Sequence, residues 1–195
     1  MTGRRRASVV GAALAAVLAL AGCAAPGGGG MGHDGHATTG TDASAEANAA
    51  DVMFAQMMIP HHEQALEMSA IVLAKEDVDP EVAELAEQIA AAQGPEIEQL
   101  EAWLDEWGVP RMPGDHAMPM DGMLTEEELD ELETADGASG SQLFLEQMIE
   151  HHEGAIDMAD QHQASGEHEG ALELSAAIIE AQEAEIERMQ ELLAA

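Results

Sequence analysis

Apolar side chains recur every three or four residues over most of the chain beyond residue 50, which is the period of an α-helix buried along one face. No segment alternates apolar and polar residues long enough to predict a strand. Asp79-Pro80 supplies an N-cap and a first-turn proline, and Thr125 with Glu128 fits a capping box. This spacing and these caps predict four long helices and one short helix, over residues 51–75, 80–107, 125–134, 141–165 and 167–195.

The two halves of this helical region resemble each other. Each half is expected to hold two long helices joined by a short turn, and a longer crossover connects the halves. This order predicts an all-α fold, a four-helix bundle built from two pseudo-repeated helical hairpins. The expected domain spans residues 50–195, with repeat one at 50–107, a Met-rich crossover at 108–140 and repeat two at 141–195.

The clearest sign of duplication is a motif that occurs twice, Met-x-x-His-His-x-x-Ala-x-x-Met. Its first methionine, first histidine, alanine and last methionine share one helix face. Imidazole and thioether are donors that soft metals prefer, so the motif predicts copper binding, as Cu(I) or Cu(II). Adjacent histidines lie about 100° apart on a helix, which leaves open which one of each pair is a ligand. The candidate ligands are Met58, His61, His62, Met68, Met148, His151, His152 and Met158.

The repeat continues in the helix that follows each motif. Gln93 and Glu96 in repeat one, like Gln182 and Glu185 in repeat two, lie on an apolar stripe. A carboxylate buried there needs a partner. A histidine N–H on the neighbouring helix would supply one, and would orient the ring as the outer shell of a metal site does. The alternative is that these four side chains lie at the helix surface beside the stripe.

The first 22 residues are predicted to be a lipoprotein signal peptide. Arginines at positions 4–6 precede a short apolar run, and Leu20-Ala-Gly-Cys23 resembles a bacterial lipobox. This predicts cleavage before Cys23 and lipidation of its sulfur, which would hold the protein on the extracytoplasmic side of the bacterial cell membrane. The alternative is an ordinary signal peptide. Residues 23–49, rich in glycine and small polar side chains, are predicted to be a flexible tether.

The chain is strongly acidic, with a net charge of −33. All 39 acidic residues lie beyond residue 22, whereas three of the six basic residues lie within the signal. Such a surface repels nucleic acid and attracts cations. The single cysteine allows no internal disulfide. Neither a Gly-x-Ser-x-Gly turn nor a phosphate-binding glycine loop occurs, so we expect a binding protein and not an enzyme.

The crossover contains a second group of soft donors. Such a group suits transient capture of Cu(I) or Ag(I), although methionines there could instead cover apolar gaps between helices. The candidate residues of this auxiliary site are Met112, His116, Met118, Met120 and Met123.

These motifs resemble those of the bacterial family known as domain of unknown function 305. The resemblance covers about residues 50–195. It rests on His-His-x-x-Ala-x-x-Met followed, on the next helix, by Gln-x-x-Glu-Ile. It implies a ferritin-like four-helix fold and, through members tied to extracytoplasmic copper binding and copper tolerance, a part in copper sequestration or homeostasis. Pro60, directly before His61, departs from the second copy, where Glu150 stands.

We therefore expect a membrane-tethered, extracytoplasmic protein that binds copper and also silver. One alternative is a structural or protein-interaction lipoprotein whose histidines and methionines are core packing. A di-iron protein is disfavoured because no Glu-x-x-His occurs. A second copy of the chain and a copper-handling protein are the partner proteins that the sequence leaves open. Because imidazole binds metal only when neutral, binding should weaken as pH falls through the histidine range near ~6.5.

Overall fold

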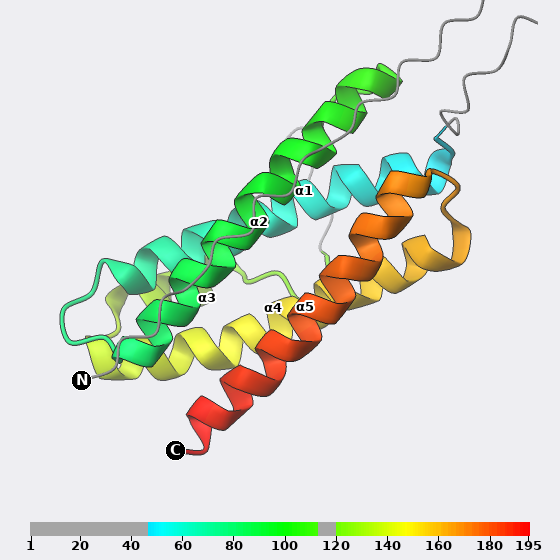
Figure 1. The fold of residues 1–195 in the computed structure, drawn as a ribbon. Helices are drawn as coiled ribbons and strands as arrows, with labels where there is room; N and C mark the ends of the chain where they lie inside the picture. The colour runs from blue at the N-terminus through cyan, green and yellow to red at the C-terminus, as the bar shows by residue number, and fades with distance from the viewer. Residues whose placement is uncertain (1–46, 113–119) are drawn as a thin grey trace, which may run out of the picture. The chain divides into compact units, whose positions relative to one another are not determined.

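The computed structural model describes residues 47–112 and 120–195, and these form five α-helices and no strand (Figure 1). The predicted all-α class is confirmed. The helices are α1 (Ala49–Leu73), α2 (Pro80–Trp107), α3 (Glu126–Thr134), α4 (Gly137–Ser165) and α5 (Glu169–Leu193).

Several sequence predictions fall outside these described residues. They are the export signal, Cys23, most of the tether, His116 and Met118. Within the two described ranges, no helix has the length and apolar character needed to cross a membrane.

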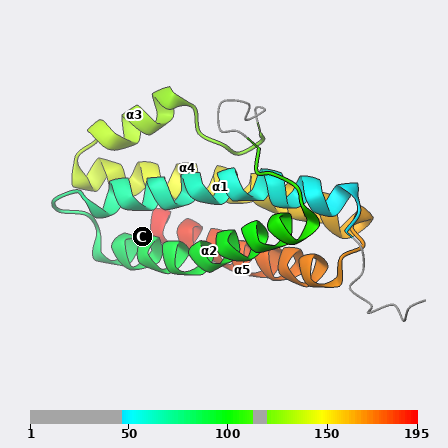
Figure 2. The ribbon, with the colours of Figure 1, turned by 90° about the horizontal axis from the view of Figure 1, so that it is seen from above.

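Helices α1 and α4 form the central pair of the helical region. α1 packs against α2, α4 packs against α5, and α1 packs along α4, whereas α2 and α5 have little contact. Figure 2 shows α3 on one side of the α1–α4 layer and α2 and α5 on the other. Since each central helix carries one copy of the repeated motif, the packing brings the two copies together.

Local capping fixes where the helices begin and end. The Asn48 side chain accepts hydrogen bonds from the first turn of α1, and Asp79 caps α2. The expected start of the fourth helix at residue 141 is wrong by about one turn, because Asp136 is the N-cap of α4. Ser141 instead donates to the Gly137 carbonyl at 2.7 Å and accepts from the Asp79 backbone N–H at 3.0 Å, tying α4 to the α1–α2 turn.

The apolar core has two parts, with the histidine pairs between them along α1 and α4. One part includes Met68, Val72, Phe144 and Met148. The other includes Phe54, Met58, Leu100, Ala155 and Ile178. The motif histidines therefore occupy the middle of the α1–α4 interface, enclosed at both ends by packed apolar side chains.

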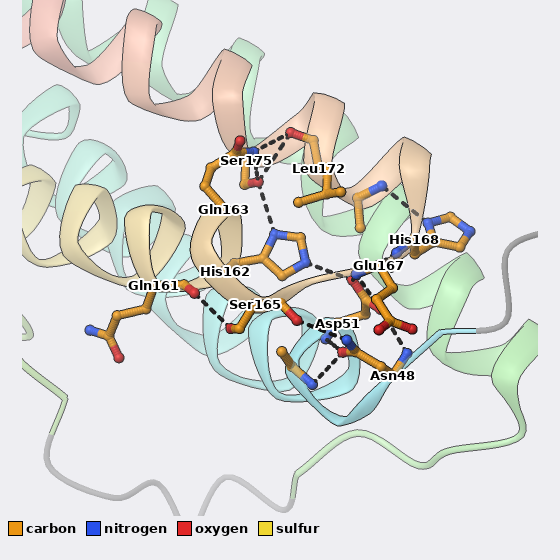
Figure 3. A network of polar contacts seen from close by, with 12 residues as sticks. Asn48, Asp51, Gln161, His162, Gln163, Ser165, Glu167, His168, Leu172 and Ser175 are labelled. Carbon is orange, nitrogen blue, oxygen red and sulfur yellow. Dashed lines mark hydrogen bonds and ion pairs between the residues drawn. The ribbon is translucent and has the colours of Figure 1, made fainter.

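A buried polar network joins the start of α1 to the α4–α5 turn (Figure 3). The His162 ring is hydrogen-bonded to Asp51 and to Ser175, at 2.8 Å in each case. Asp51 also accepts from the backbone N–H groups of Glu167 and His168. Burial alone would raise the pKa of Asp51, but hydrogen bonds from Asn48, His162, His168 and Glu167 outweigh it and lower that pKa. All three side chains of the Asp51–His162–Ser175 set are at least 98 % buried, so they act as a structural clamp.

Candidate metal centre

His61 of α1 and His151 of α4 meet at the middle of the helix pair. Their ring centroids lie 3.8 Å apart with the planes inclined by 42°. Both side chains are fully buried. The prediction that a histidine of one repeat faces a histidine of the other is confirmed. The meeting follows from the antiparallel crossing of α1 and α4, because equivalent positions near the midpoint of such a pair lie opposite each other.

The ring nitrogens of this pair are buried and lack a well-formed hydrogen bond. Within the described residues, none of the Nδ1 and Nε2 atoms of His61 and His151 meets full hydrogen-bond geometry, although the Asp121 backbone lies near the His61 ring and the His61 backbone lies near the His151 ring. Buried polar groups are almost always paired, and each unpaired one costs about 1–3 kcal/mol. Unpaired nitrogens at one point of the core are therefore expensive for the fold, and each neutral ring has one lone pair that can bind a ligand.

The electrostatic setting keeps these imidazoles neutral. Burial, and then the neighbouring imidazoles of His62 and His152, lower the pKa of His61 to about 3. Burial and the same cluster of rings lower the pKa of His151 well below its usual value. Neutral imidazole is the form that binds metal. The expectation that binding weakens as pH falls through about 6.5 is therefore corrected, since loss by protonation of this pair moves to much lower pH.

The second histidine of each pair binds a carboxylate, as predicted. His62 Nε2 lies 2.8 Å from Glu96 Oε2, and His152 Nε2 lies 2.7 Å from Glu185 Oε2. Both histidines are fully buried, whereas both glutamates are about four-fifths buried. With Nε2–H donated to the carboxylate, Nδ1 keeps a free lone pair, the arrangement that orients metal-binding histidines.

The two glutamines of the repeat are buried beside the site, but they do not bond to the histidines. In the described part of the chain, Gln93 has no partner for either amide atom and Gln182 has none for Oε1. Their burial matches the predicted inward stripe. A part in orienting the imidazoles stays a prediction for these two side chains.

The motif methionines do not gather around the histidines as a single set. Met58 and Met148, three residues before His61 and His151, are fully buried. Met68 packs with Met148 in one part of the core, and Met158 lies against the other part. The sequence pattern placed the last methionine of each motif on the same helix face as the histidines. Because α1 and α4 run in opposite directions from their crossing, Met68 and Met158 lie toward opposite ends of the helix pair.

The three described crossover methionines do not all lie together. Met112 and Met120 line one cavity together with Met53 and Met57 of α1. Met123 is half-buried and does not line this cavity. Met53 and Met57 were not singled out from the sequence. Their spacing of four residues on one helix face was the signal that could have identified them.

Soft or borderline monovalent ions fit the donors at the centre. Across residues 47–112 and 120–195, no group of three or more His, Cys, Asp or Glu side chains converges as a metal cluster. The centre consists instead of neutral imidazole nitrogens in an apolar surround, with two glutamates behind them. Imidazole suits copper and related ions, and the uncharged donors favour an ion of low charge in a buried position.

Solved structures similar to this chain come from proteins of one family. A protein of this family from Streptomyces coelicolor, proposed to be secreted, is 38 % identical, with a TM-score of 0.69 over 74 % of this chain and 91 % of that one. A fragment from Deinococcus radiodurans is 32 % identical, with a TM-score of 0.68 over 76 % and 97 %. CopM in its Cu(I)-bound form is 34 % identical, with a TM-score of 0.61 over 73 % and 94 %.

CopM has also been solved in Cu(II)-bound, Ag-bound and apo forms. No curated protein matches this chain significantly. The model of the family described as domain of unknown function 305 (DUF305) matches residues 51–193. That match spans every helix that carries the histidine and glutamate motifs, and the chain therefore belongs to the DUF305 family.

Proposed function

We propose that this protein is an extracytoplasmic copper-binding protein that holds a monovalent copper or silver ion between the histidine pairs of α1 and α4. The observation that carries the proposal is the pair of fully buried rings of His61 and His151, with 3.8 Å between their centroids, each of which offers one lone pair when neutral. The Nδ1 atoms of His62 and His152 are two further donors, which Glu96 and Glu185 would orient. The ion is cargo, and sequestration or homeostasis of copper follows as the role.

The burial of this centre favours Cu(I) and Ag(I) over divalent ions. The cost of burying a charge rises steeply with that charge, and the surrounding side chains offer no carboxylate in direct contact with His61 or His151 within the described residues. CopM, a relative of the same family, has been solved with Cu(I), with Cu(II) and with silver, which supports copper and silver as the metals.

We further propose that the protein is tethered to the outer face of the bacterial cell membrane through lipid on Cys23. Support comes from the lipobox-like Leu20-Ala-Gly-Cys23 and from the Streptomyces relative that is proposed to be secreted. Replacement of Cys23 by serine should move the protein from the membrane fraction to the soluble fraction. Retention on the membrane would contradict the lipid anchor.

The metal proposal is tested by titrating the purified full chain with Cu(I), Ag(I), Zn²⁺ and Fe²⁺ against competing chelators. Cu(I) and Ag(I) should bind most tightly, and His61→Leu/His151→Leu should remove the ion that is held between the histidine pairs. His168→Asn is the matched control, because it changes a histidine outside the pairs and asparagine can still cap α5. Equal affinity for the double variant and the native chain would favour the alternative that these histidines are core packing.

A further inference from the structure

A second group of methionines lines a cavity beside the start of α1. The cavity has a volume of about 290 Å³, and four thioethers line it: Met53 and Met57 of α1, Met120 from the segment before α3, and Met158 of α4. Met53 and Met57 are four residues apart and share a helix face. Met53 is 59 % exposed. Among the large apolar side chains of the described residues, only Leu193 is exposed as well, at 38 %. The cavity is thus open to solvent at a sulfur-bearing rim.

This cavity is separate from the histidine centre. None of the four motif histidines lines it. Met53 lies eight residues before His61, about 12 Å along the helix axis, and Met57 points about 100° away from Met58, which faces the core. Any ion held by these thioethers would occupy a different place from one held between the imidazoles.

The segment that supplies Met120 is fixed against α4 by close backbone contact. A Cβ on Gly154 would lie 2.0 Å from the Asp121 carbonyl oxygen. Gly122, with φ of 83°, would bring a Cβ within 2.6 Å of the Glu150 carbonyl oxygen. These two glycines allow the backbone to approach closely, so Met120, 93 % buried, is held in position over the cavity.

The cavity wall attracts cations but offers no competing ligand for a soft one. Asp121 and Asp157 line it, and no Lys or Arg is among the described residues that do. His162 also lines it, yet both of its ring nitrogens are engaged, by Asp51 and Ser175 (Figure 3). Beside the Asp121 and Asp157 carboxylates, the cavity offers four uncharged thioethers, which favour Cu(I) and Ag(I) over zinc, calcium or magnesium.

We propose that Met53, Met57, Met120 and Met158 form a second, solvent-open site for Cu(I) or Ag(I). The site is independent of the histidine centre. It shares Met120 with the auxiliary crossover site predicted from the sequence, and combines that methionine with three on α1 and α4. Its open rim suits exchange of the ion with the surroundings, whereas the histidine centre is closed.

The test uses Ag(I) and the full chain carrying His61→Leu/His151→Leu, with the methionine methyl groups labelled with carbon-13. Addition of Ag(I) should shift the methyl signals of Met53, Met57, Met120 and Met158, with one equivalent bound. Adding Met53→Leu/Met57→Leu/Met120→Leu should remove that equivalent. Adding Met189→Leu, which changes a buried methionine outside both sites, should leave it bound. Leucine keeps the wall apolar at similar volume, which limits the cost to under about 1.5 kcal/mol at each buried position.

Met53→Leu alone is the second variant, because an exposed side chain can be changed without unfolding the protein. This single change should weaken the binding of Ag(I) measurably. Loss of all Ag(I) binding in the histidine double variant would overturn the second site and leave the histidine centre standing. Unchanged binding in the triple methionine variant would also overturn it. Unchanged total binding in the histidine double variant would instead contradict the proposed function.

Discussion

His61→Leu should stabilise the metal-free protein, although it removes a fully buried side chain from the middle of the fold. His61 has two ring nitrogens without partners among the described residues, and leucine has a similar volume and no polar atom. Removal of these unpaired groups should raise the free energy of unfolding by about 1–3 kcal/mol at pH 7. Urea denaturation measures the gain as a higher midpoint at an unchanged slope.

The difference in stability between His61→Leu and the native chain should grow as the pH falls. In the unfolded chain His61 titrates near 6.5, whereas in the fold its pKa is about 3. Between these values the unfolded state binds the extra proton, so the native protein loses stability as pH falls from about 6.5 toward 3, by about 1.4 kcal/mol per pH unit. At pH 5 this adds about 2 kcal/mol to the advantage of His61→Leu, which has no such group.

His162→Leu is the matched control, since His162 is equally buried but has both nitrogens hydrogen-bonded. This change should destabilise the fold by at least about 2 kcal/mol, because it leaves Asp51 and Ser175 without their partner. Copper should raise the midpoint of the native chain more than that of His61→Leu, which lacks one ligand of the histidine centre. A destabilised metal-free His61→Leu, resembling His162→Leu, would refute the reasoning that the His61 nitrogens are unpaired.

Three further changes probe the supports of the site. Glu96→Gln should lower Cu(I) affinity about tenfold in a chelator competition, because a carboxylate that orients a ligand histidine is lost; unchanged affinity would exclude a supporting role. Asp51→Ala should cost about 3–5 kcal/mol in urea denaturation, because it breaks a buried network. Gly154→Ala should lower the free energy of unfolding by about 1–3 kcal/mol, because the new Cβ overlaps the Asp121 carbonyl. Gly94→Ala is the control, because its Cβ meets open space, and it should raise the free energy of unfolding by about 0.5–1 kcal/mol. Equal effects of the two changes would contradict the close contact at Gly154.

The parts of the site that follow from helix periodicity could be predicted from the sequence. The duplicated motif placed His61 and His151 on facing stripes, and the next helix placed Glu96 within reach of a histidine, because residues three, four or seven positions apart share a face whatever surrounds the helix. The all-α class follows from the same regularity. These features need only the local geometry of one helix and the order of the segments.

The parts that depend on crossing direction and on distant pairs could not be predicted in this way. A stripe on one helix does not say which way its partner runs, and the antiparallel crossing of α1 and α4 carries Met68 and Met158 about 10 Å from the crossing in opposite directions. Asp51 meets His162 from 111 residues away. The methionine cavity likewise combines α1, α4 and the crossover, so no single segment of sequence contains it.

The position of the unpaired imidazoles within an otherwise consistent fold argues that they serve binding. The helix caps and the Asp51–His162 clamp satisfy their polar groups and agree with the same architecture. Ser69 Oγ and Gln147 Oε1 are buried without a partner in the described residues, but these are single atoms without a counterpart in the other repeat. The rule that buried polar groups are paired is broken at equivalent places in both repeats, His61 and His151, together with their neighbours in the same cluster. Sequences break such local rules mainly where function requires it, and offset the cost elsewhere. A packing role alone would be met better by leucine at both positions, so the cost of the histidines supports the proposal that they bind an ion that leucine could not bind.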